Sequence, residues 1–64
     1  MKYMKEIHGD LLIRMLDDGA MERYDFSTKM WIEDQSMAQV FYGGILATTI
    51  SEKEAEEIIK KNEE

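Results

Sequence analysis

The chain has 64 residues, of which 44% are hydrophobic, a formal net charge of −6 and no cysteine. A chain of this length makes one domain, residues 1–64, near the lower limit at which a core stabilises a fold without a disulfide or a metal. The lack of cysteine excludes disulfides and thiolate metal sites, and the single histidine leaves no zinc site. The acidic balance argues against direct nucleic-acid binding. The apolar runs are too short for a membrane span or a signal-peptide core, so we expect a cytoplasmic protein without membrane contact.

Residues 1–8 alternate weakly between apolar and polar side chains. This pattern favours an edge strand, although a frayed lead-in or a helical turn also fits. Lys2 and Lys5 are the kind of side chain that keeps an edge strand from pairing with another chain. We therefore expect an edge strand that ends in a turn at residues 8–10.

Residues 9–34 carry the densest apolar runs and the clearest turn signals. The runs predict three short strands, at residues 11–16, 21–26 and 30–32, joined by turns at residues 17–19 and 25–28. The first of these strands is apolar on both faces, which is typical of a central strand covered on both sides. Asp18-Gly19 between apolar runs indicates a hairpin, because glycine adopts positive φ at little steric cost.

The segment at 36–42 fits two structures. Met37, Val40 and Phe41 recur at helical spacing, which favours a short helix ended by the two glycines that follow. Alternation at period 2 also fits, so a strand stays open as the alternative. The uncharged run at 45–50, rich in β-branched residues, predicts a final strand.

A C-terminal helix, Ser51–Lys61, has the most complete set of signals. Ser51 and Glu54 have the spacing of a capping box, and acidic residues in the first turn with lysines in the last complement the helix dipole. A narrow apolar stripe would dock on one sheet face: Ala55, Ile58 and Ile59. The predicted fold is α+β, a small antiparallel β-meander of three to five short strands with this helix packed on one face.

No catalytic, cofactor or metal motif rises above background. His8 with Glu6 or Asp10 could act as a general base, but a surface histidine in a turn is the commoner role. Five carboxylates near the predicted turns could gather round a cation, although they lack the spacing of a calcium loop: Asp10, Asp17, Asp18, Glu33 and Asp34. We therefore predict a protein that is not an enzyme and binds no cofactor.

The chain has more apolar side chains than the narrow apolar stripe of one helix can cover on the sheet. The second sheet face would be covered by the segment at 36–42, by a second copy of the chain or by a different protein. The side chains predicted to contact a partner are Leu12, Leu16, Trp31, Met37, Phe41 and Tyr42. A homodimer is the simplest arrangement, since a two-fold contact needs only one self-complementary patch. The predicted function is a non-catalytic protein–protein interaction or self-associating module, of the small acidic kind common in bacteria and phages.

Two other functions fit the sequence less well. The acidic side chains of the C-terminal helix would let the chain imitate nucleic acid and occupy a nucleic-acid-binding protein, but interspersed lysines dilute that charge. A carboxylate–metal hydrolase would use Asp10, Asp17, Asp18 and Glu33, whose spacing is unlike that of known metal loops.

Overall fold

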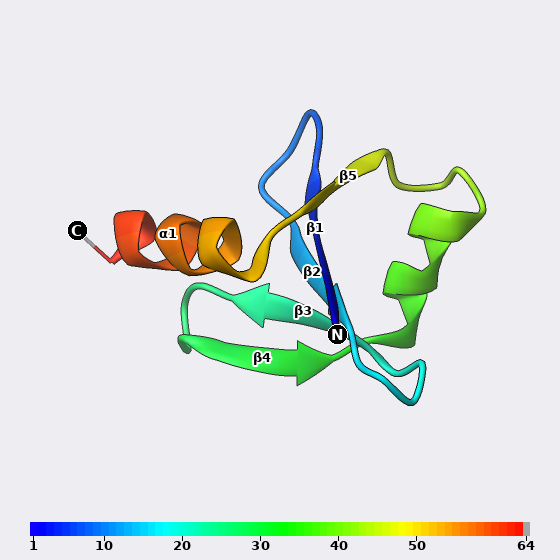
Figure 1. The fold of residues 1–64 in the computed structure, drawn as a ribbon, viewed down its shortest axis with the longest axis horizontal. Helices are drawn as coiled ribbons and strands as arrows, with labels where there is room; N and C mark the ends of the chain where they lie inside the picture. The colour runs from blue at the N-terminus through cyan, green and yellow to red at the C-terminus, as the bar shows by residue number, and fades with distance from the viewer. Residues whose placement is uncertain (64) are drawn as a thin grey trace.

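The structure, a computed structural model, describes residues 1–63, which form one five-stranded antiparallel sheet with a 3₁₀ helix and an α-helix (Figure 1). The elements in chain order are β1 (Lys2–Glu6), β2 (Leu12–Met15), β3 (Met21–Asp25), β4 (Met30–Glu33), η1 (Gln35–Phe41), β5 (Ala47–Ile50) and α1 (Glu52–Asn62). The strands lie in the order β4-β3-β2-β1-β5, so β1 to β4 make a meander and β5 returns to pair with β1. The predicted α+β fold, with its antiparallel meander and C-terminal helix, is confirmed.

The strand predicted to be central, β2, is the middle strand of the sheet. Its side chains Leu12 and Ile13 are 1% and 0% exposed and belong to two separate core clusters, one on each face. The turn after β2 also follows the prediction, because Gly19 adopts φ 90°. The N–H of Ala20 donates to the Asp18 carboxylate at 2.9 Å and closes that turn.

The helix α1 begins where the sequence predicts. The Ser51 hydroxyl accepts a hydrogen bond from the N–H of Glu54 at 3.0 Å, which caps the first turn. The stripe of α1 buries Ala55, 1% exposed, against Leu12 and Ile50 on the sheet face that we call the helix face. Six partly buried side chains complete this cluster: Tyr3, Tyr24, Phe26, Trp31, Ile58 and Ile59. Within the described residues 1–63, no helix is long and apolar enough to cross a membrane.

The opposite sheet face is covered by η1. Of the two structures that fit residues 36–42, the helix is the one observed, and Asp34 caps it by accepting a hydrogen bond from the N–H of Ser36 at 3.0 Å. Met37, 7% exposed, packs against a buried cluster on this face formed by Met4, Ile13 and Met21. The chain therefore covers its second face with its own segment, which removes an uncovered face as a reason for self-association.

The prediction of an edge strand at residues 1–8 is wrong. β1 lies inside the sheet, with Tyr3 opposite Arg14 of β2 on one side and Ile50 of β5 on the other. The edges are β4 and β5. Local alternation cannot reveal this arrangement, because the pairing of β1 with β5 joins opposite ends of the chain.

Strand β5 is shorter than the predicted run at 45–50. It begins at Ala47, and Ile45 belongs to the preceding loop, where its N–H donates to the carbonyl oxygen of Gln39 at 3.4 Å. The loop between η1 and β5 turns at Gly43, where φ is 86°.

Candidate partner-binding surface

The structure separates the six side chains predicted to contact a partner. Leu12 and Met37 are buried in the two core clusters and contact the chain's own sheet and helices, so we correct the prediction for these two. Leu16 and Trp31 are half-buried. Phe41 and Tyr42, at the end of η1, are 51% and 85% exposed, and the Lys2 ammonium lies 5.9 Å from the centre of the Phe41 ring.

Trp31 is engaged within the monomer. Its ring meets Tyr24 and Tyr3 edge-on, with centroids 5.3 Å and 6.0 Å away. The Arg14 guanidinium lies 4.2 Å from the centre of the Trp31 ring, and its Nε donates to Glu22 Oε1 at 2.6 Å. Because the chain's own arginine stacks on the tryptophan, Trp31 belongs to the helix-face core.

A stretch without charge carries three of the six large apolar side chains that are exposed in residues 1–63. Residues 35–51, which we call the uncharged segment, contain no Asp, Glu, Lys or Arg in a chain that is 34% charged. The segment forms η1, the loop after it and β5 (Figure 1). Three exposed side chains lie in it: Phe41, Tyr42 and Leu46, the last 61% exposed.

Ile7 lies beside this segment, since its N–H donates to the Leu46 carbonyl oxygen at 2.8 Å and its side chain is 54% exposed. Of the six large apolar side chains that are exposed in residues 1–63, four are therefore in or next to the uncharged segment. The strand pattern at residues 45–50 does not by itself mark Leu46 as a contact residue. The gap in charged residues is the signal that would have found it.

The outer edge of β5 is open. Because the Ile7 N–H bonds to Leu46 and backbone groups alternate along a strand, Leu46, Thr48 and Ile50 direct their N–H and C=O groups towards β1. Ala47 and Thr49 direct theirs away from the sheet. The side chains of both Thr48 and Thr49 are exposed. An uncharged open edge of this kind is a template for pairing with another strand.

The other edge strand, β4, is bordered by charge. Lys29 precedes it, Glu33 ends it and Asp34 follows. Charged side chains at an edge oppose pairing with a second chain. The two edges of the sheet therefore differ, and β5 is the one without such protection.

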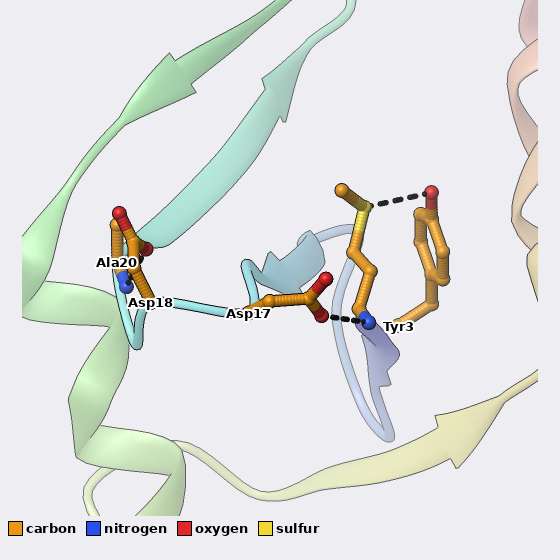
Figure 2. Close-up of polar contacts among 5 residues, drawn as sticks. Tyr3, Asp17, Asp18 and Ala20 are labelled. Carbon is orange, nitrogen blue, oxygen red and sulfur yellow. Dashed lines mark hydrogen bonds and ion pairs between the residues drawn. The ribbon is translucent and has the colours of Figure 1, made fainter.

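The turn carboxylates bind within the chain. Asp17 accepts a hydrogen bond from the amino group of Met1, and this bond and the positive charge lower the pKa of Asp17 (Figure 2). Hydrogen bonds from the Ser36 hydroxyl and from Arg23, whose Nε lies 3.0 Å from Asp34 Oδ2, lower the pKa of Asp34. In residues 1–63, no three histidine or carboxylate side chains converge so that they could hold a metal ion.

An open cavity of about 290 Å³ lies between the β1–β2 turn and α1. Its lining consists of Lys5, Glu6, Gly9, Asp10, Leu11, Leu12, Phe26, Ile58 and Asn62. Glu6 is held there by the N–H of Leu11, 3.4 Å from its carboxylate. His8, the candidate general base, is exposed and is not one of the residues that line this cavity.

Comparison of the chain with protein-family models, with curated proteins and with solved structures finds no match.

Proposed function

We propose that this protein is a non-catalytic interaction module that binds another protein through the uncharged segment. One observation carries the proposal: Phe41, Tyr42 and Leu46 are exposed together in a stretch free of charge. Exposed apolar side chains gathered in one region mark interaction sites, and aromatic residues are enriched at their centres.

The electrostatics of the chain support the same segment. The net charge of −6 repels acidic partners over most of the surface. Charged residues are depleted at the centre of protein interfaces, because desolvating them costs more than the new contacts return. The uncharged segment has this composition, and the Lys2 ammonium lies 5.9 Å from the Phe41 ring centre, so a partner that buries the segment desolvates few charges.

The carboxylates support a non-catalytic role. Asp18 and Asp34 accept hydrogen bonds from backbone N–H groups and serve a turn and a helix cap, and Asp17 accepts one from the amino group of Met1. These carboxylates are therefore engaged in contacts within the chain.

Site-specific photocrosslinking tests the proposal. A photoreactive amino acid replaces Tyr42 in one variant and the exposed Glu57 of α1 in a control, each expressed in the cells that naturally produce the protein. We expect a discrete crosslinked product, with this chain or with another protein, from position 42 and none from position 57. Equal crosslinking from both positions, or none from position 42, would show that the uncharged segment is not a binding surface.

Salt dependence separates this function from nucleic-acid mimicry. A complex held by apolar side chains should persist or strengthen as ionic strength rises, whereas one that depends on the carboxylates of α1 should weaken steeply. Repeating the position-42 crosslinking in lysates of these cells at low and high salt makes the comparison. A product that disappears at high salt would favour the mimic.

A further inference from the structure

We infer that the partner is a second copy of this chain, joined by antiparallel pairing of the two β5 strands into one continuous sheet. This pairing rests on the proposed function and names the partner of the same uncharged segment. It places the open edge of each β5 against the other across a two-fold axis.

The backbone of β5 is self-complementary in one register. Ala47 and Thr49 direct their N–H and C=O groups outwards, as the bonding of β1 to Leu46 requires. A two-fold axis at Thr48 sets Ala47 of one chain opposite Thr49 of the second copy. The two residues then exchange both hydrogen bonds, and the symmetric pair does the same. Every outward donor and acceptor between residues 47 and 49 is satisfied.

The side chains fit this register without conflict. Thr48 lies opposite Thr48 of the second copy, a pair that is favourable across antiparallel strands. Leu46, 61% exposed in the monomer, lies opposite Ile50 of the second copy on the helix face. The small residues Ala47 and Thr49 meet on the other face. No charged side chain is opposed by another, because the whole strand is uncharged.

The helix α1 leaves this edge open. After Ile50 the chain turns inwards, and Ala55 packs on Leu12 of the central strand. Thr48 and Thr49 stay exposed beside it. The second copy therefore reaches the edge of β5 without displacing any part of the fold.

The same pairing is unfavourable at β4. The N–H of Asp34 donates to Met21 of β3, so the outward residues of β4 are Trp31 and Glu33, and the two-fold axis would fall at Ile32. That register sets the acidic Glu33 against Trp31 and Asp34 against Met30. Burying carboxylates beside apolar side chains is costly, so the two edges are not equivalent.

Sedimentation of the purified chain, from low micromolar to millimolar concentration, gives the first measurement. We expect the mass to rise from 7.5 kDa towards twice that value. Amide hydrogen exchange gives the second, at the same concentrations. The N–H groups of Ala47 and Thr49 should become protected as the dimer forms, while that of Thr48, which faces β1, should be protected throughout.

A charge at the two-fold axis tests the register. Thr48→Glu places two carboxylates opposite each other in the dimer, and we expect the dimer to weaken about tenfold or more. In the monomer Thr48 lies opposite Lys5, so the new carboxylate leaves the fold intact. Thr48→Val is the matched control and should keep the dimer.

Proline at the outward position gives an independent test. Thr49→Pro removes a donor that faces away from β1, and edge strands tolerate such a proline. It should weaken the dimer, whereas Thr49→Val should not. Thermal unfolding at low concentration shows whether both variants keep the monomer fold.

The outcomes separate this pairing from the proposed function. The pairing of β5 is wrong if the chain stays a monomer at millimolar concentration. It is also wrong if a dimer forms in which the N–H groups of Ala47 and Thr49 stay unprotected and whose affinity is unchanged by Thr48→Glu. If position 42 still crosslinks to another protein in that case, the proposed function stands. If position 42 crosslinks to nothing, both are wrong.

Discussion

The guanidinium carbon of Arg14 lies 4.2 Å from the centre of the Trp31 ring, although Arg14 is on β2 and Trp31 is two strands away on β4. Arg14 is the one charged residue in the apolar run of the central strand. It spans β3 across the helix face, and its Nε is bound to Glu22 Oε1 at 2.6 Å. On the helix face, a cation therefore lies between an aromatic ring and a carboxylate.

Replacing Arg14 should therefore destabilise the fold. The Arg14 and Glu22 side chains are 21% and 17% exposed, so Arg14→Ala loses the stacking on Trp31 and leaves a carboxylate poorly solvated. We expect the free energy of unfolding, measured by urea titration, to fall by about 1–3 kcal/mol. The loss should shrink in a Glu22→Gln background. An unchanged loss there would show that the ion pair contributes nothing.

The packing of η1 on the sheet depends on Met37. This side chain is 7% exposed and packs on Met4, Ile13 and Met21, so Met37→Ala leaves a cavity under the sheet. We expect a loss of about 2–4 kcal/mol in unfolding free energy, a large fraction of what a domain of this size has. Tyr42→Ala is the control, because that side chain is 85% exposed. It should change stability by less than about 0.5 kcal/mol. Equal losses would mean that η1 does not anchor through Met37.

The docking of α1 depends on its apolar stripe. Ile58 packs against the cluster of Leu12, Ile50 and Ala55, so Ile58→Asp places an unpaired charge in this contact and should unfold or strongly destabilise the domain. Glu57→Gln, next to it on an exposed position, should change stability by less than about 0.5 kcal/mol. Circular dichroism during thermal unfolding measures both. If the two substitutions change the stability equally, Ile58 does not lie on the face of α1 that packs against the sheet.

The cap of η1 should make stability depend on pH. Hydrogen bonds from the Ser36 hydroxyl and from Arg23 lower the pKa of Asp34 below its ordinary value of 3.8. A carboxyl group whose pKa is lower in the folded state stabilises that state at pH values above its unfolded pKa, and the stabilisation is lost as the pH falls through the folded pKa. The wild type should therefore exceed Asp34→Asn in stability at neutral pH, and the difference should narrow below about pH 4.

Chemical denaturation at a series of pH values measures this difference. Asp18→Asn is the control, since Asp18 accepts only the N–H of Ala20 in its turn. If the difference in unfolding free energy between the wild type and Asp34→Asn is the same at neutral and acidic pH, the ionised carboxylate of Asp34 does not stabilise the fold.

The elements that follow from local chemistry were predictable from the sequence. Gly19 after Asp18 predicts a turn because positive φ is cheap for glycine, and the structure has it at φ 90°. Ser51 predicts the start of α1 because its hydroxyl satisfies a free N–H, and it does so. The two-faced apolar run around Leu12 and Ile13 predicts a central strand, and β2 is central. Each signal lies within a few residues of the structure that it specifies.

The tertiary structure alone decided what depends on contacts between distant parts of the chain. It moved residues 2–6 from a predicted edge to the interior by pairing them with residues 47–50, and it buried Leu12 and Met37, two residues predicted to face a partner. It also placed β5 at an edge of the sheet; the lack of charge in this strand is visible in the sequence, but its edge position is not. The physical reason is that a period-2 or helical pattern determines only which side chains share a face. Which strands are neighbours, and which segment packs over each face of the sheet, depend on contacts between residues far apart in the sequence.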